Sequence, residues 1–101
     1  MSVSNQIGRT IWTQLRQLDK WALGDWGAKD AVYMKDGLKF KTSGAVKFKG
    51  YVYIQLDQGR DLYNVIFAKV RKFEWKEDSR VEGVYADQLV KIIDRKVLGK
   101  K

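Results

Sequence analysis

The sequence of 101 residues contains no cysteine and no histidine. The chain therefore cannot form disulfides, use a thiolate nucleophile or an imidazole base, or build the usual zinc and haem sites. It also lacks a Walker loop, a G-x-G-x-x-G motif and a nucleophile elbow. These absences predict a protein that is not an enzyme and binds no metal or cofactor.

Proline is absent as well, and no apolar run approaches the roughly 18 residues of a membrane span. A chain without proline favours helices and hairpins that are joined by glycine-based turns. Residues 1–9 contain no apolar segment of the kind found in signal peptides. We therefore expect one domain over residues 1–101 that works in the cytoplasm and has no membrane partner.

Cations are what the chain has in excess. Its 20 Lys and Arg against 12 Asp and Glu give a formal net charge of +8 at pH 7. This balance favours polyanionic partners, such as nucleic acid or an acidic protein surface. With 45% hydrophobic residues the chain can still bury a core. The charge thus indicates a class of partner and leaves the oligomeric state open.

An amphipathic helix is predicted from about Ser4 to Leu18, with Ser2 or Ser4 as its cap. Its apolar stripe consists of Val3, Ile7, Ile11, Leu15 and Leu18. A second helix is predicted from Ser79, because Ser79-Arg80-Val81-Glu82 matches a capping box. Its inner stripe consists of Val81, Tyr85, Leu89, Ile92 and Ile93. Gly99 is the predicted stop of this helix.

Between the helices the apolar period changes to two, which is typical of strands. The first strand is expected at Ala31 to Lys35, followed by a type I′ turn at Asp36-Gly37. Strand two alternates Leu38, Phe40 and Thr42 with Lys39, Lys41 and Ser43. Strand three alternates Val46, Phe48, Val52, Ile54 and Leu56 with Lys47, Lys49, Tyr51, Tyr53 and Gln55. Strand four begins at Tyr63, Val65 and Phe67.

Two segments leave alternatives open. Trp21 to Gly27 indicates an irregular strand entry or a bulge. Ala68 to Lys76 is either the bulged end of a long strand or a fifth strand. The predicted fold is α+β in two layers: a helix, four or five consecutive antiparallel strands and a helix, with both helices on one sheet face.

The other sheet face is the first candidate binding surface. Its members are the cations and tyrosines of strands two and three: Lys39, Lys41, Lys47, Lys49, Tyr51 and Tyr53. Cations can follow phosphates, and tyrosine rings can stack on unpaired bases. The alternative is a solvated face, because strands favour Tyr and edge lysines keep a sheet soluble.

A second candidate interface combines aromatic residues with further cations. It consists of Trp26, Lys69, Arg71, Lys72, Trp75 and Lys76. Trp26 is expected to be exposed beside two glycines, and tryptophan is enriched in interface hot spots. For the rest, a nucleic-acid groove competes with a strand that turns Phe73 and Trp75 inward and its lysines outward.

The segment Lys49-Gly50-Tyr51-Val52-Tyr53-Ile54-Gln55-Leu56 is similar to the third-strand signature of RNA-recognition-motif domains. In that family the two central aromatic residues stack on bases, a role that the resemblance gives to Tyr51 and Tyr53. Val52 and Leu56 depart from the pattern. That fold also opens with a strand, so the signature indicates a shared basic, aromatic strand face and not a shared ancestor.

Five short stretches resemble small uncharacterised proteins that are carried by bacteriophages and other mobile elements. They are Thr10-Ile11 with Gln14-Leu15, Gly27-Ala28-Lys29, Gly37-Leu38 with Phe40-Lys41, Asp61-Leu62-Tyr63-Asn64-Val65 with Phe67, and Val84-Tyr85-Ala86-Asp87 with Leu89. The resemblance implies a phage-type accessory protein in a bacterial cytosol and carries no family site.

Two functions fit these observations. The first is non-catalytic binding of single-stranded DNA or RNA through the basic, aromatic sheet face. The alternative is a protein-interaction module that inhibits a host defence factor, as anti-CRISPR proteins and nuclease inhibitors do. A steep loss of affinity with salt would distinguish the first from the second.

Overall fold

The computed structural model describes residues 6–99, and its strands form one antiparallel sheet in the order β1-β2-β3-β4-β5. The elements along the chain are α1 (Gln6–Leu18), α2 (Ala22–Asp25), β1 (Lys29–Tyr33), β2 (Gly37–Lys41), β3 (Tyr51–Asp57), β4 (Leu62–Arg71), β5 (Glu74–Val84), the 3-10 helix η2 (Ala86–Gln88) and α3 (Leu89–Val97). The predicted α+β order is confirmed. Of the segment from Ala68 to Lys76, residues 68–71 are the end of β4 and residues 74–76 begin a fifth strand.

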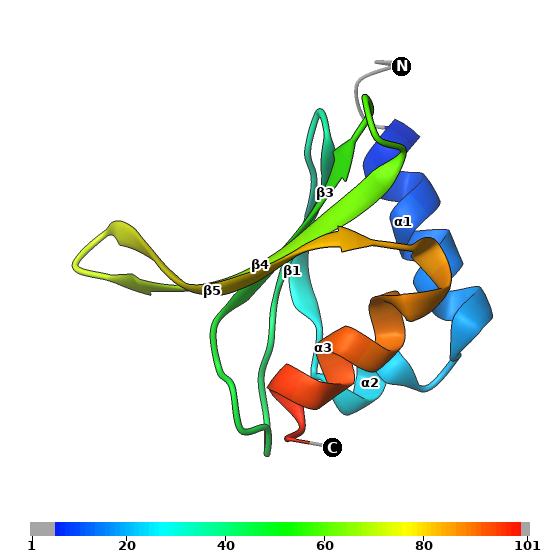
Figure 1. Cartoon of the computed structure of the whole chain (residues 1–101). Helices are drawn as coiled ribbons and strands as arrows, with labels where there is room; N and C mark the ends of the chain where they lie inside the picture. Colours follow the sequence, from blue (N-terminus) through cyan, green and yellow to red (C-terminus); the bar gives the residue numbers. More distant parts are fainter. Residues whose placement is uncertain (1–5, 100–101) are drawn as a thin grey trace.

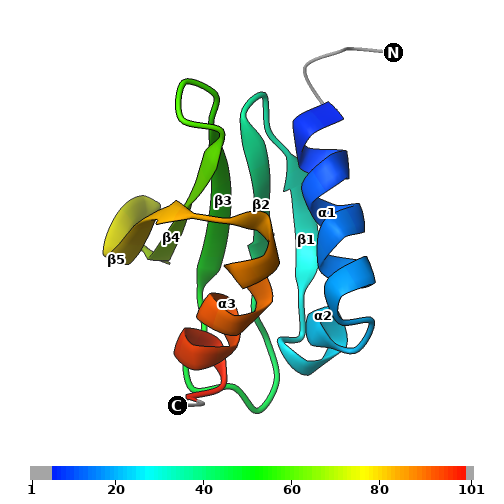
Figure 2. The same ribbon diagram turned by 45° about the vertical axis from the view of Figure 1, so that its right-hand side comes forward.

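Both long helices cover the same face of the sheet (Figures 1 and 2). Helix α1 buries Ile11 and Leu15, and α3 buries Leu89, Ile93 and Val97. Against them lie the inward side chains of the strands, which include Leu38, Phe40, Val52, Ile54, Val65 and Phe67. The predicted parity is therefore confirmed for the residues that lie in β2 and β3. The expected cap at Ser2 or Ser4 lies outside the described residues.

The segment from Trp21 to Gly27 contains the short helix α2 in place of the expected strand entry. The ring of Trp26 is fully buried and stacks on Phe40, with centroids 6.0 Å apart and 4° between the planes. Its Nε1 donates a 2.6 Å hydrogen bond to the Asp94 carboxylate on α3. The prediction of an exposed Trp26 was wrong, because the indole fills space between the two layers and finds its polar partner there.

The β1–β2 turn also differs from the expected type I′ geometry. The two-residue loop consists of Lys35 and Asp36, and Met34 N–H donates to the Gly37 carbonyl at 2.8 Å. Neither Asp36 nor Gly37 has a positive φ. Gly37 is instead the first residue of β2, where a Cβ would stand 1.9 Å from the Ile54 carbonyl oxygen. Close backbone approach explains this glycine.

Strand β3 begins at Tyr51, five residues later than the alternating pattern from Val46 suggests. The preceding loop folds back under α3, where Lys47 N–H and Phe48 N–H both donate to the Val97 carbonyl at 2.8 and 3.2 Å. The buried Thr42 closes this loop, since its hydroxyl donates to the Phe48 carbonyl at 2.8 Å. The apolar and polar side chains of residues 46–50 still alternate, because they are alternately buried and exposed, although the backbone of these residues is not part of the sheet.

The second helix starts later than its sequence signature indicates. Ser79 to Glu82 lies within β5, where Ser79 pairs with Phe67 and Val81 pairs with Val65. Pairing with β4 satisfies the backbone groups that the predicted capping box was expected to serve. The cap is supplied downstream, where the Gln88 side chain accepts a 3.2 Å hydrogen bond from Tyr85 N–H. Gly99 has the positive φ of +71° that is typical of a helix stop, as expected.

Candidate nucleic-acid interface

The sheet face opposite the helices carries outward side chains from several strands. Cross-strand pairing aligns Lys39 with Tyr53, Tyr53 with Ile66, and Ile66 with Arg80. It also aligns Tyr51 with Ala68 and Ala68 with Glu77. Directly paired residues point to the same face, so this outer face contains both the predicted cations and carboxylates.

An aromatic pair forms where β3 meets the β4–β5 hairpin. The rings of Tyr51 and Trp75 lie 5.7 Å apart between centroids, tilted by 42°. Lys39 Nζ lies 5.7 Å from the Tyr51 centroid and 5.6 Å from that of Trp75. Trp75 remains 42% exposed, so the inward orientation considered for it is wrong. The structure thus brings together members of both predicted surfaces.

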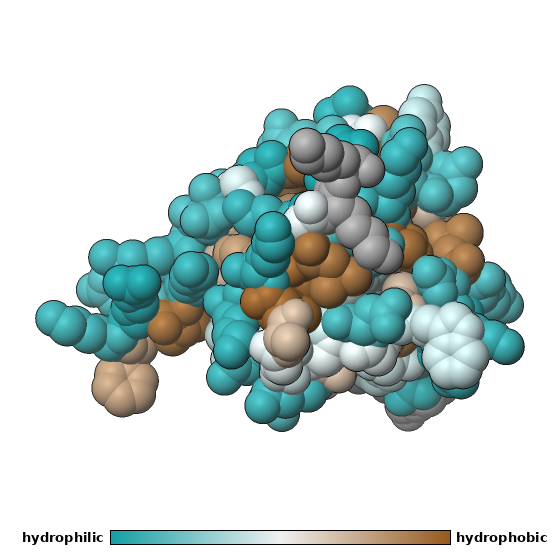
Figure 3. All heavy atoms as spheres, turned by 90° about the horizontal axis from the view of Figure 1, so that it is seen from below, coloured by the Kyte–Doolittle hydropathy of each residue, from teal (hydrophilic) through white to brown (hydrophobic). Residues whose placement is uncertain are grey.

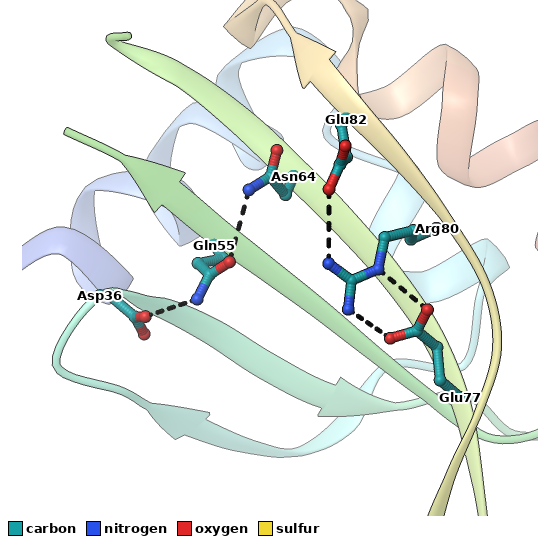
Figure 4. Close-up of polar contacts among 6 residues, drawn as sticks. All are labelled: Asp36, Gln55, Asn64, Glu77, Arg80 and Glu82. Carbon is teal, nitrogen blue, oxygen red and sulfur yellow. Dashed lines mark hydrogen bonds and ion pairs between the residues drawn. The ribbon is translucent and has the colours of Figure 1, made fainter. Parts of the chain in front are cut away.

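Tyr53 lies in a different environment from Tyr51. Its hydroxyl donates a hydrogen bond to the Asp36 carboxylate, which also accepts a 2.8 Å bond from Gln55 Nε2. Asn64 Nδ2 extends this row by donating to Gln55 Oε1 at 3.4 Å (Figure 4). Burial and the bond to Asp36 raise the pKa of Tyr53 to about 12. Burial also opposes ionisation of Asp36, but the bonds from Tyr53 and Gln55 outweigh it and lower the pKa of that carboxyl.

A second acidic group lies on β5, at the edge of the same face (Figure 4). Arg80 Nε donates to Glu77 Oε2 at 2.9 Å, and its Nη1 lies 3.4 Å from Glu82 Oε2. The hydrogen bond from Arg80 lowers the pKa of Glu77 and the bond to Glu77 raises that of Arg80. Together with Asp36, these carboxylates make this part of the outer face unfavourable for phosphate.

The cations gather at the other end of β2 and β3, around an open pocket of about 470 Å³. Lys41, Lys49, Lys69 and Arg71 line it, and none of the Asp and Glu side chains in residues 6–99 does. The remaining lining residues are Thr42, Ser43, Gly44, Gly50, Tyr51 and Val70. Tyr51 belongs both to this basic pocket and to the aromatic pair. The pocket therefore joins four cations to an aromatic surface.

Lys47 does not join the other predicted cations. Its side chain runs past Gly99 at the end of α3, where a Cβ on the glycine would stand 2.4 Å from Lys47 Cδ. The prediction that Lys47 lies on the outer face was wrong, because residues 46–50 belong to the loop under α3. Lys49, two residues later, does line the basic pocket.

Beyond Ala68 the β4–β5 hairpin continues without a third strand. In this arm, residues 69–76, Lys69 pairs with Lys76, Val70 with Trp75, and Arg71 with Glu74. The arm projects from the body in Figure 1. Lys72 and Phe73 form its turn with positive φ values of 51° and 65°. The left-handed region costs a residue with a side chain about 1–2 kcal/mol.

Phe73 itself is fully exposed, with a relative accessibility of 102%. It buries no apolar surface, so its ring gives the fold nothing in return for the strained turn. The inward orientation considered for Phe73 is therefore wrong. The sequence signal for this residue was present, since Phe73 stands among four cations in residues 69–76.

Among residues 6–99, no group of three or more Asp and Glu side chains could hold a metal ion. No helix in that range is long and apolar enough to cross a membrane. No protein-family model matches the chain, and the searches of curated proteins and of solved structures found no match either.

Proposed function

We propose that this protein binds a single strand of nucleic acid without catalysis, as a phage-type accessory protein in the bacterial cytosol. The basic pocket carries the proposal, because four cations converge there and no carboxylate from the described part of the chain lines it. Phosphates would lie along Lys41, Lys49, Lys69 and Arg71. An unpaired base would stack on the Tyr51–Trp75 pair beside them, since aromatic rings accept every base.

The acidic part of the outer face limits the path of the strand. Asp36, Glu77 and Glu82 repel phosphates on the surface that Tyr53 occupies. The binding residues are therefore Lys39, Lys41, Lys49, Tyr51, Lys69, Arg71 and Trp75. Tyr53 and Lys47 take no part.

Fluorescence anisotropy with labelled single-stranded DNA and RNA tests this function. Each neutralised phosphate of a single strand contributes about 0.7 to the slope of log affinity against log salt concentration. Four contacts in the pocket therefore predict a slope of about 3. The proposal fails if neither DNA nor RNA binds at micromolar protein in low salt.

A protein partner is the second candidate. The alternation of Asp36, Arg80, Glu77 and Glu82 on the outer face favours it, because mixed charges suit a protein surface better than a polyanion. Such a module would inhibit a host defence factor. Capture from host lysate that survives nuclease treatment and high salt would support this candidate over the first.

A further inference from the structure

We propose that the β4–β5 arm is a wedge for the fork where a single strand leaves a duplex, with Phe73 stacking on the terminal base pair. This inference rests on the proposed function and adds the form of nucleic acid that the site recognises. Its starting point is the turn of the arm, where a bulky, fully exposed phenylalanine holds a positive φ. Neither packing against residues 6–99 nor backbone preference accounts for phenylalanine at this position.

The charge of the arm selects nucleic acid as the occupant. Residues 69–76 contain four cations and one carboxylate. That carboxylate, on Glu74, is 3.9 Å from Lys76 Nζ and is partly neutralised by it. Arg71 and Lys72 carry their charge along the arm, whereas Lys69 Nζ lies 5.6 Å from the Phe48 ring centroid and its charge also acts on the Asp78 carboxylate. A protein pocket for Phe73 would need a strongly acidic rim, whereas a nucleic-acid backbone supplies negative charge on both sides of its bases.

The arm is continuous with the basic pocket, and this favours a fork over a simple duplex as the ligand. Lys69 and Arg71 belong to both the pocket and the arm. A strand held in the pocket therefore leads along the arm toward its tip. The three residue pairs beyond Ala68 extend the ribbon by about 10 Å at about 3.3 Å per residue. The tip would then meet the place where the bound strand separates from its complement.

The shape and chemistry of the tip suit this place. The arm is a two-stranded ribbon that projects from the body, and Figure 3 shows it mostly lined by hydrophilic side chains with apolar ones among them. Val70 and Trp75 pair across it and are both partly exposed. The Phe73 ring has no donor or acceptor, so it stacks on a base pair without reading its sequence. Lys72 next to it can contact the phosphate of either strand.

A comparison of three labelled oligonucleotides tests the wedge: a single strand, a blunt duplex, and forks with a 5′ or a 3′ tail, each as DNA and as RNA. We expect the wild-type protein to prefer one fork over a single strand of equal length by roughly tenfold, the size of one stacking contact. A 2-aminopurine at the first unpaired position should brighten on binding, because Phe73 displaces that base from the stack.

Two variants isolate the ring from the backbone. Phe73→Asn removes the ring but tolerates the positive φ, so single-strand affinity should stay within twofold while the fork preference and the brightening are lost. Phe73→Trp should restore both. The wedge is overturned if wild type shows no fork preference or if Phe73→Asn keeps it, even when single strands bind normally. Absence of all single-strand binding would instead overturn the proposed function, and the wedge with it.

Discussion

The Tyr53 hydroxyl on β3 donates a hydrogen bond to the Asp36 carboxylate in the β1–β2 turn. This bond gives Tyr53 a different environment from Tyr51, although the two tyrosines have equivalent positions in the alternating sequence pattern. Tyr51 and Tyr53 both point to the outer face, two residues apart on β3. Only Tyr51 faces the basic pocket, whereas Tyr53 is held beside a carboxylate that repels phosphate. Tyr51 is therefore placed to contact a bound strand, and Tyr53 is placed to stabilise the β1–β2 turn.

The two tyrosines should therefore respond differently to substitution. Tyr53→Phe should lower the free energy of unfolding by about 1 kcal/mol through loss of the bond to Asp36, and leave single-strand affinity within twofold. Tyr51→Ala should weaken single-strand binding by about 1–3 kcal/mol. Urea denaturation and fluorescence anisotropy on both variants measure these effects. A loss of affinity in Tyr53→Phe with none in Tyr51→Ala would contradict the assignment.

The same pair predicts pH dependence at both extremes. The pKa of Asp36 is lowered in the folded state, so its contribution to stability is present above its unfolded pKa of about 4 and is lost as pH falls further. The pKa of Tyr53 is raised to about 12, so its contribution is present below its unfolded pKa of about 10 and is lost as pH rises through 12. Absorbance titration at 295 nm should show a late tyrosine that is missing in Tyr53→Phe. Unfolding in urea at pH 2–5 should depend less on pH in Asp36→Asn.

At Gly8, helix propensity and close packing predict opposite effects of a substitution by alanine on stability. It lies inside α1, where alanine is favoured by about 1 kcal/mol. A Cβ at Gly8 would, however, stand 2.6 Å from the Gly37 carbonyl oxygen and 3.1 Å from Tyr33 Cα. Gly8→Ala should therefore lower the free energy of unfolding by about 1–3 kcal/mol, as urea denaturation would show.

Gly24 is the matched control, because it lies in α2 with no atom within 4 Å of the position of a Cβ. Gly24→Ala should raise stability slightly, by up to about 1 kcal/mol. If Gly8→Ala proves to be the stabilising variant of the two, the close approach of α1 to the β1–β2 hairpin is wrong.

Local periodicity was sufficient to predict the layers of the fold. Leu38 and Phe40 in β2, and Val52 and Ile54 in β3, alternate with polar neighbours because a strand that covers a core has a period of two. Ile11 and Leu15 likewise reveal the inner face of α1. These patterns report burial, and burial determines which face of each element packs.

Non-local interactions account for what the sequence did not reveal. Ser79 to Glu82 matches a helix start, but its backbone pairs with β4, a partner that the local signature does not include. Trp26 is buried by contacts with Phe40 and Asp94, which are 14 and 68 residues away. The basic pocket likewise assembles from β2, β4 and the loop before β3, so no single run of sequence marks it.

Trp26 and Trp21 form a second matched pair. Trp26→Ala should lower the free energy of unfolding by about 3–5 kcal/mol, because it leaves a cavity beside Phe40 and removes a bond to Asp94. Trp21 is 68% exposed and contacts Lys20 on the surface, so Trp21→Ala should change stability by no more than about 0.5 kcal/mol. Thermal denaturation of both variants checks the ranking. Similar losses in the two variants would mean that Trp26 is not the buried indole.

Lys49 and Lys47 give the sharpest test of the interface, because they are two residues apart and only Lys49 lines the basic pocket. Lys49→Gln should weaken single-strand binding and reduce the salt slope by about 0.7, the effect of one lost phosphate contact on a single strand. Lys47→Gln makes the same change in net charge beside Gly99 and should leave the slope unchanged. Anisotropy titrations at several salt concentrations measure both slopes. Equal reductions in the two variants would show that the strand responds to net charge alone, and the basic pocket would then not be the binding site.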